Sequence, residues 1–223
     1  MSFSAVIFDF DGVIADSELL ANIALAKCLT NIGLPTSVED CMSDYYGTNW
    51  QETVRRIEIK FNSTLPKDFQ AHLEHEHSLV SGGAAPIEGI AELLESLGGK
   101  SLAVASSSRR DVIESSLARY GIAHHFGEHI YSADGWDRGK PFPDIYFAAA
   151  EGLVVDPIDC RAIEDSPNGV RAALAAGMTV IGFCGGSHIV DKTSHSEMLR
   201  AIGVHGIAFA HSDIALLETQ ATY

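Results

Sequence analysis

Short β-branched or apolar runs alternate with longer helical stretches along most of this chain. The runs are AVIFDF (residues 5–10), SLAVAS (101–106), HIYSA (129–133), CRAIED (160–165), TVIGF (179–183) and IAFA (207–210). Continuous apolar strands that alternate with helices are typical of a parallel sheet whose two faces are both covered. The pattern therefore predicts an α/β fold with a Rossmann-like three-layer core, in which a parallel sheet lies between two layers of helices.

Capping residues mark the ends of several of these helices. Ser166 and Pro167 open SPNGVRAALAAG as N-cap and first-turn residue, and Gly177 fits the left-handed position after the last turn. Gly121 ends RDVIESSLARYG in the same way, and Pro143 begins another helix. The one biased stretch, CGGSHIVDKTSHSE (184–197), is interpreted as a loop between the last two strands.

Residues 17–80 interrupt the alternation of strands and helices. The segments there are SELLANIALAKCLTNIG, SVEDCMSDYYG, NWQETVRRIEIKFN and PKDFQAHLEHEHSLV, and each opens with a capping residue or a proline. SGGAAP (81–86) is rich in small residues and ends in proline, as expected for a hinge. We therefore expect an all-helical cap domain at 16–81, inserted into a core domain made of 1–15 and 82–223.

The bulk properties of the chain limit its partners. A net charge of −15 over 223 residues argues against nucleic acid, whose phosphates require basic surfaces. The N-terminal residues do not have the pattern of a secretory signal, so none is expected, and no apolar run approaches the roughly 18 residues of a membrane helix. Four scattered cysteines indicate free thiols in a reducing compartment. We expect a cytoplasmic protein that binds neither nucleic acid nor membrane, as a monomer or weak homodimer.

Polar residues follow four of the expected strands. In an open parallel sheet, ligands bind beyond the carboxyl ends of the strands. The residues there are Asp9 and Asp11, then Ser106, Ser107 and Ser108, then Lys140, then Glu164 and Asp165. Carboxylates crowded at one edge repel one another unless a cation lies among them, and oxygen ligands favour Mg²⁺. The sequence therefore predicts Mg²⁺ as a cofactor at this edge.

The same residues suit phosphoryl transfer. A hydroxyl and an ammonium group opposite the metal would hold the remaining oxygens of a phosphate, and the reaction needs mainly positioning and charge neutralisation. An aspartate is able to act as a covalent nucleophile that forms an aspartyl phosphate. A second aspartate, where the chain leaves the strand, is placed to act as acid and base.

Four sequence motifs in this order give a family resemblance. DFDGVIADS, ASSS, GKPFPD and IEDSPNG resemble the four ordered motifs of the haloacid dehalogenase superfamily. A helical segment between the first two motifs resembles the subgroup of phosphoglycolate phosphatases and β-phosphoglucomutases. The resemblance covers essentially the whole chain, and four motifs in order are far more specific than any one of them.

The resemblance implies the roles of the first motif. Asp9 is expected to be the nucleophile and a Mg²⁺ ligand through its carboxylate. Asp11 is expected to be the general acid and base, and to bind the metal through its main-chain carbonyl. True dehalogenases resemble this chain but lack a carboxylate at the position of Asp11, so its presence favours phosphoryl chemistry.

The resemblance also implies roles for the later motifs. Ser106 is expected to hydrogen-bond the transferring phosphoryl group, and Lys140 to pair with the nucleophile and the phosphoryl oxygens. Asp165 is expected to bind the metal directly, and Glu164 to act through water. Gly12 would let the backbone turn close to the phosphate.

The expected reaction is Mg²⁺-dependent hydrolysis of a small phosphorylated metabolite, a sugar or sugar-acid phosphate monoester. One alternative is a phosphomutase like β-phosphoglucomutase. Trp50 stands where those mutases carry an arginine, and Ala21 stands where they carry a histidine. Both departures favour the phosphatase. A distant alternative is a phospho-accepting signalling module, but such modules are shorter and have no inserted cap.

Several further residues are candidates for substrate binding. In the cap these are Gly47, Thr48, Asn49 and Trp50, with packing of the cap interior as the alternative. Near the second strand end they are Ser107, Ser108 and Arg109, with the start of a helix as the alternative. The histidines of HLEHEH (72–77) and HHFGEH (124–129) match no metal-binding spacing and are interpreted as solvated surface.

Overall fold

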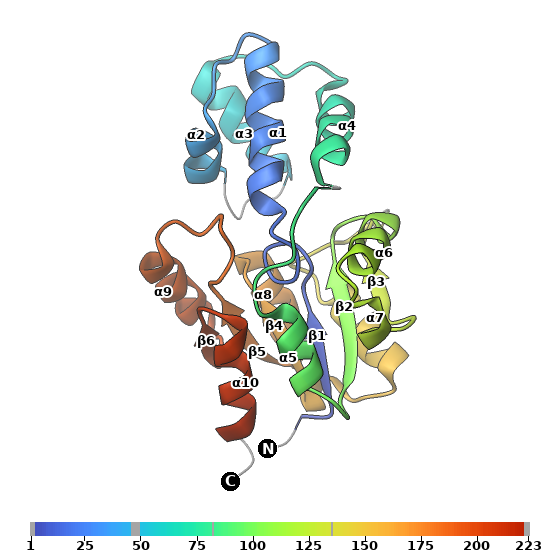
Figure 1. The fold of residues 1–223 in the computed structure, drawn as a ribbon. Coiled ribbons are helices and arrows are strands. Elements are labelled where there is room, and N and C mark those ends of the chain that lie inside the picture. Colours follow the sequence, from blue (N-terminus) through green and yellow to red (C-terminus); the bar gives the residue numbers. More distant parts are fainter. Residues whose placement is uncertain (1–2, 46–49, 82, 135, 221–223) are drawn as a thin grey trace. The chain divides into compact units, whose positions relative to one another are not determined.

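Six parallel strands form one sheet in the computed structural model, which describes residues 3–45, 50–81, 83–134 and 136–220 (Figure 1). The strands are β1 (Ala5–Phe8), β2 (Ser101–Ser106), β3 (Ile130–Ser132), β4 (Cys160–Glu164), β5 (Thr179–Phe183) and β6 (Gly206–Ala208). Their order is β3-β2-β1-β4-β5-β6, so β1 lies between β2 and β4. The predicted α/β fold is confirmed, and each strand coincides with or overlaps a predicted run.

Helices cover both faces of the sheet. Along β1, Val6 and Phe8 belong to one buried cluster, whereas Ala5 and Ile7 belong to another, because successive side chains point to opposite faces. The first cluster includes residues of α5 (Ile90–Ser96), α6 (Arg110–Arg119) and α10 (His211–Gln220). The second includes residues of α7 (Asp144–Leu153), α8 (Pro167–Ala175) and α9 (Lys192–Ile202). This is the predicted three-layer arrangement.

The expected helix caps are present. Ser166 Oγ accepts a hydrogen bond from the Gly169 N–H at 3.1 Å, and Pro167 is the first residue of α8. Gly121 and Gly177 have φ of 76° and 84°, the left-handed conformation that glycine adopts without a Cβ clash. Two short 3₁₀ helices, Ala123–His125 and Pro157–Asp159, precede β3 and β4.

The loop prediction for 184–197 is wrong over its second half, where α9 begins. Asp191 is the N-cap of this helix and accepts hydrogen bonds from the N–H groups of Thr193 and Ser194, at 3.1 and 3.0 Å. His195 and Leu199 on α9 are buried. The polar, Ser- and His-rich composition hid a capped helix with a buried face. Helix α5 was not predicted either.

A separate helical unit comprises α1 (Glu18–Asn31), α2 (Val38–Asp44), α3 (Trp50–Phe61) and α4 (Phe69–Ser81). The chain divides into Met1–Asp16 with Ala85–Tyr223 as one unit, and Ser17–Ala84 as the other. These limits fall close to the predicted boundaries at 15/16 and 81/82. The helical unit has its own buried cluster, which includes Leu29, Cys41 and Ile57. Its role as a cap stays a prediction.

The interior of each unit contains free thiols. Cys28 and Cys41 are buried in the helical unit, and Cys160 and Cys184 are buried in the sheet unit. Burial raises the pKa of the Cys160 and Cys184 thiols to about 11, which keeps them in the unreactive protonated form at neutral pH. Among the described residues, no helix is long and apolar enough to span a bilayer.

Candidate active site

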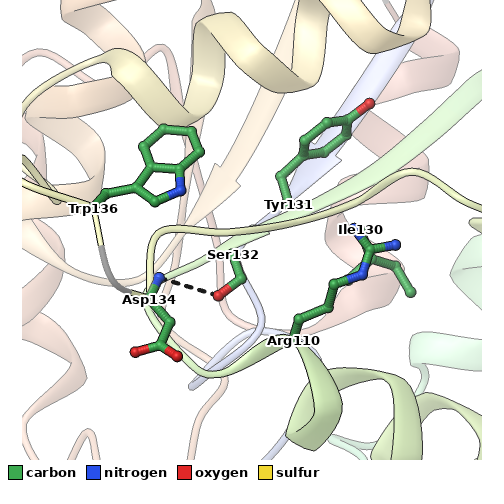
Figure 2. A pocket seen from close by; sticks show the side chains of 6 residues that line it. All are labelled: Arg110, Ile130, Tyr131, Ser132, Asp134 and Trp136. Atoms are coloured by element: carbon green, nitrogen blue, oxygen red, sulfur yellow. Dashed lines mark hydrogen bonds between the residues drawn. The ribbon is translucent and has the colours of Figure 1, made fainter.

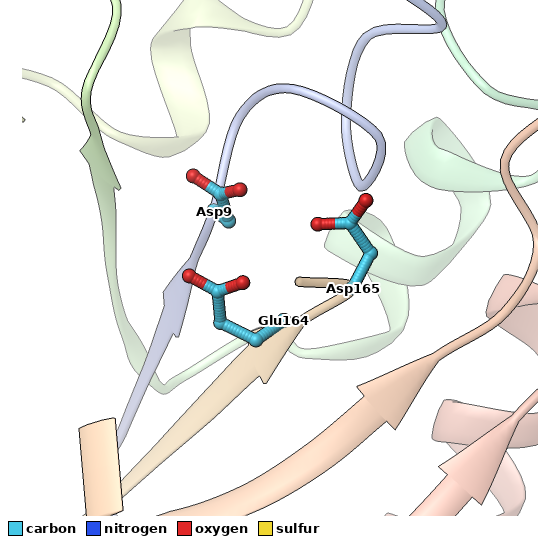
Figure 3. Close-up of side chains that lie close together, drawn as sticks. All are labelled: Asp9, Glu164 and Asp165. Carbon is cyan, nitrogen blue, oxygen red and sulfur yellow. The ribbon is translucent and has the colours of Figure 1, made fainter. Parts of the chain in front are cut away.

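The ends of the two central strands bring three carboxylates together. Asp9 directly follows β1. Glu164 is the last residue of β4, which pairs with β1 in parallel register, and Asp165 directly follows it. The main-chain N–H of Asp9 donates to the carbonyl of Ile163 at 3.0 Å and extends this pairing. Carboxylate oxygens of the three acidic residues lie within 4.8 Å of one another, and all three side chains are buried (Figure 3). We call this set the acidic cluster.

Lys140 reaches the acidic cluster from the loop that follows β3. Its Nζ donates to Asp9 Oδ1 at 2.8 Å and to Glu164 Oε1 at 2.6 Å, and its side chain is 7% exposed. Burial alone would lower the pKa of Lys140, but the charges of Asp9 and Glu164 outweigh burial and raise it. The lysine therefore stays protonated and holds the two carboxylates in place.

The Glu164 carboxylate accepts hydrogen bonds from several further groups. The hydroxyl of Tyr146, a fully buried residue of α7, donates to Glu164 Oε1 at 2.6 Å. The hydroxyl and N–H of Ser166 donate to Oε2 at 3.2 and 3.3 Å. A Cβ on Gly169 would lie 1.8 Å from Oε1, so only glycine leaves room for this carboxylate. The sequence prediction did not include Tyr146, Ser166 or Gly169 as site residues.

Asp11 is held by two hydroxyls from the end of β2. Ser106 Oγ and Ser108 Oγ donate to Asp11 Oδ2 at 3.2 and 2.5 Å. Ser106 Oγ also accepts from the Ser108 N–H at 3.0 Å, which fixes the turn that carries both serines. The predicted residues Asp9, Asp11, Ser106 and Lys140 therefore all lie at the carboxyl ends of β1 and β2 or in the loop after β3.

The single positive charge of Lys140 does not balance the three carboxylates of the acidic cluster. Burial raises the pKa of Asp9 well above its ordinary value, and the neighbouring Glu164 adds to this, while Lys140 opposes it. Asp165 shows the same direction for the same reasons. A divalent cation among oxygen donors would stabilise the ionised carboxylates, and this all-oxygen donor set fits Mg²⁺.

The other candidate residues have diverse surroundings. Gly12 has φ of 76°, and a Cβ there would lie 2.2 Å from Asp165 Oδ2, so this glycine makes room for the acidic cluster. Ser107 and Arg109 are exposed, and Arg109 pairs with Asp111 at 2.7 Å at the start of α6. Their predicted roles in substrate binding stay predictions.

The cap candidates are only partly visible. Gly47, Thr48 and Asn49 lie outside the described residues. Trp50 is the first residue of α3, and its ring stacks on Phe69 with centroids 6.3 Å apart and an interplanar angle of 2°. This contact supports the packing alternative for Trp50.

A cavity of about 360 Å³ lies at the carboxyl end of the edge strand β3 (Figure 2). Its lining residues are Arg110, Ile130, Tyr131, Ser132, Asp134 and Trp136, none of them predicted. Ser132 Oγ donates to the Ser108 carbonyl at 2.6 Å, which connects this wall to the turn that holds Asp11. Among the described residues, the acidic cluster is the only group of three or more potential ligands that lie close enough together to hold a metal ion.

The fold and the site together define a class, an α/β enzyme whose active site lies at the carboxyl edge of a parallel sheet. Buried carboxylates, a lysine and two hydroxyls meet at that edge. The sequence pattern of haloacid dehalogenase-like hydrolases matches residues 6–183. The chain therefore belongs to the haloacid dehalogenase-like hydrolase family, which confirms the resemblance drawn from the four motifs.

Individual relatives agree with this assignment. A solved structure of a conserved haloacid dehalogenase-like protein of unknown function from Agrobacterium tumefaciens is 31% identical, has a TM-score of 0.90, and matches over 100% of both chains. The 6-phosphogluconate phosphatase of Escherichia coli is 26% identical over 82% of this chain and 84% of its own length. The chloroplastic protein SUPPRESSOR OF QUENCHING 1 of Arabidopsis thaliana is 35% identical over 80% of this chain, which spans 17% of that relative.

Proposed function

We propose that this protein is a Mg²⁺-dependent phosphatase that hydrolyses a small phosphate monoester, a sugar or sugar-acid phosphate, through an aspartyl phosphate on Asp9. The observation that carries the proposal is the placement of Asp9. Its carboxylate pairs with a protonated lysine and lies close to two further buried carboxylates, at the edge of the sheet where α/β proteins bind ligands. The phosphatase name of the Escherichia coli relative supports the substrate class.

The chain's own residues account for each step of hydrolysis. Asp9 attacks phosphorus with a carboxylate oxygen while the bond from phosphorus to the substrate oxygen breaks. Asp11 gives its proton to the leaving oxygen, then takes a proton from water, whose oxygen attacks the aspartyl phosphate. Inorganic phosphate leaves and the Asp9 carboxylate is restored. The bonds from Ser106 and Ser108 hold Asp11 in position for both transfers.

Lys140 and the acidic cluster supply the electrostatics. The ammonium group of Lys140, 2.8 Å from Asp9 Oδ1, is placed to neutralise phosphoryl oxygens beside the nucleophile. Asp9, Asp165 and the main-chain carbonyl of Asp11 would hold Mg²⁺, with Glu164 acting through water. When bound, the metal supplies neutralisation of charge on the phosphoryl oxygens.

The test is a phosphate-release screen over a panel of phosphorylated metabolites with Mg²⁺, and with EDTA as the control. The panel includes 6-phosphogluconate, a ketose 1-phosphate and β-glucose 1-phosphate. We expect Mg²⁺-dependent release from sugar or sugar-acid phosphates. Asp9→Asn should abolish turnover and leave the fold intact by circular dichroism. Substantial activity in this variant would refute the mechanism.

The same samples separate the two alternatives. With β-glucose 1-phosphate and its bisphosphate, a mutase forms the isomer without free phosphate, which phosphorus NMR detects. Trp50 stands where the mutases carry an arginine, and its ring stacks on Phe69. This substitution supports the phosphatase. A stable phosphorylated Asp9 without phosphate release would indicate a signalling module instead.

A further inference from the structure

The loop after β5, residues 184–189, places a buried histidine against the acidic cluster, and no step of the proposed mechanism uses it. His188 Nε2 lies 3.0 Å from Asp165 Oδ2, with side chains 0% and 3% exposed. With Asp165 ionised, its carboxylate accepts and the Nε2–H group of the imidazole donates. This contact engages one of the two carboxylate oxygens of Asp165.

Two glycines shape the space for this ring. A Cβ on Gly12 would lie 2.9 Å from His188 Cε1, in addition to its overlap with Asp165. A Cβ on Gly186 would lie 2.5 Å from Cε1 and 2.6 Å from Nδ1 of the same ring. The imidazole therefore packs against the backbone at two positions, Gly12 and Gly186, that have no side chain, and this close packing fixes its orientation.

The loop itself has an anchor that does not involve the imidazole. The N–H and hydroxyl of Ser187 donate to Asp16 Oδ1 at 3.1 and 2.8 Å. His195 on α9 donates from Nε2 to the main-chain carbonyl of Asp165 at 2.7 Å. The backbone of the loop and that of Asp165 are thus held by contacts other than the one between the His188 imidazole and the Asp165 carboxylate.

We propose that His188 is a positioning residue of the metal site, which holds the Asp165 carboxylate so that its second oxygen faces Asp9 and Glu164. Figure 3 shows one Asp165 oxygen directed toward the other two carboxylates and one directed away. Hydrogen-bond partners of this kind orient metal ligands, and their loss typically costs about 10–100-fold in metal affinity. The proposal rests on the proposed function in taking the acidic cluster as a site for a divalent cation.

The test is the affinity of the purified full-length chain for Mn²⁺, measured by electron paramagnetic resonance without substrate. His188→Phe keeps a ring and removes the donor, and we expect its Kd to rise roughly 10–100-fold. In His188→Gln the side-chain amide reaches toward the position of Nε2, so we expect most of the affinity to return. A wild-type Kd in the Phe variant would overturn the proposal.

A buried histidine elsewhere in the same unit serves as the matched control. The Nδ1 and Nε2 atoms of His211 lie 2.9 and 3.0 Å from the main-chain carbonyls of Glu88 and Val13, so its hydrogen bonds go to main-chain oxygens. His211→Gln should lower the melting temperature while the Mn²⁺ Kd stays at the wild-type value. An equal rise of Kd in His211→Gln and His188→Phe would show that general destabilisation is the cause, and would overturn the proposal.

Two further measurements cover a variant that does not fold and separate this proposal from the proposed function. Should His188→Phe fail to fold, His188→Asn replaces it, because the shorter asparagine amide does not reach Asp165 Oδ2. Equal Kd values for Mn²⁺ in His188→Asn and His188→Gln would then overturn the proposal. Phosphate release is measured on the same preparations. A wild-type chain that binds Mn²⁺ but hydrolyses no phosphate monoester would refute the proposed function, and the Kd series would still decide the role of His188.

Discussion

The hydroxyl of Tyr146 is a buried group whose removal has a calculable effect. It donates to Glu164 Oε1 at 2.6 Å, and the Tyr146 ring also lies under Lys140, with Nζ 5.3 Å from the ring centroid. Tyr146→Phe removes the hydroxyl and keeps the ring and its contact with the lysine. The substitution therefore isolates one hydrogen bond to a buried carboxylate.

Hydrogen bonds to charged groups contribute about 1.5–3 kcal/mol to stability, and Glu164 is fully buried, so water does not replace the lost donor. We expect Tyr146→Phe to lower the free energy of unfolding by about 1.5–3 kcal/mol. For a chain of this size the melting temperature should fall by roughly 3–12 °C.

The assay is urea unfolding in EDTA, followed by tryptophan fluorescence. The chain has two tryptophans, Trp50 in the helical unit and Trp136 in the sheet unit, so a Trp50→Phe background makes the fluorescence report the sheet unit alone. Far-UV circular dichroism is recorded on the same samples, and coincident transitions by the two probes indicate two-state unfolding.

Tyr131→Phe is the control for this measurement. The Tyr131 hydroxyl is 3.3 Å from His129 Nδ1, a long contact, and its loss should cost less than about 1 kcal/mol. A change below about 0.5 kcal/mol in Tyr146→Phe, or equal changes in both variants, would refute the importance of the hydroxyl–carboxylate bond.

Two other substitutions test the acidic cluster. A raised pKa in the folded state means that ionised Asp9 costs stability once the pH passes its unfolded value of about 3.9. Asp9→Asn should therefore become increasingly more stable than wild type as the pH rises above about 4, in urea titrations with EDTA. A difference that is constant with pH contradicts this. Gly169→Ala places a methyl group 1.8 Å from Glu164 Oε1 and should cost about 1–3 kcal/mol or more in the same assay. Gly98→Ala, whose Cβ would have 3.4 Å as its shortest contact, is its control, and equal losses would contradict the argument.

The strands and the residues of the four motifs could be predicted because each follows from a local sequence pattern. Apolar runs bounded by capping residues locate β1 and β4, and parallel topology then brings their carboxyl ends together. Asp9 and Lys140 are 131 residues apart, yet both were predicted at one site, because each motif lies at the end of a strand or in the loop that follows it.

The partners of these residues were missed because their signals depend on packing. Tyr146 lies on the buried, apolar face of α7, and no pattern in the sequence indicates that its hydroxyl contacts Glu164. His188 was grouped with a polar loop, because its burial depends on close packing against Gly12, which is distant in sequence, as well as against the neighbouring Gly186. Helix α9 was hidden for a related reason, since His195 and Ser196 are polar by type and buried in fact.

The crowding around Gly12 changes how sequence variation at this position should be interpreted. With φ of 76° and a Cβ position 2.2 Å from Asp165 Oδ2, residue 12 has no room for any side chain. In a pooled selection for function, every substitution there should disappear, whether or not it meets the substrate. Intolerance at Gly12 would therefore report the fit of two neighbouring loops. Selection at the exposed Ser107 and Arg109 would instead test their predicted contact with the substrate.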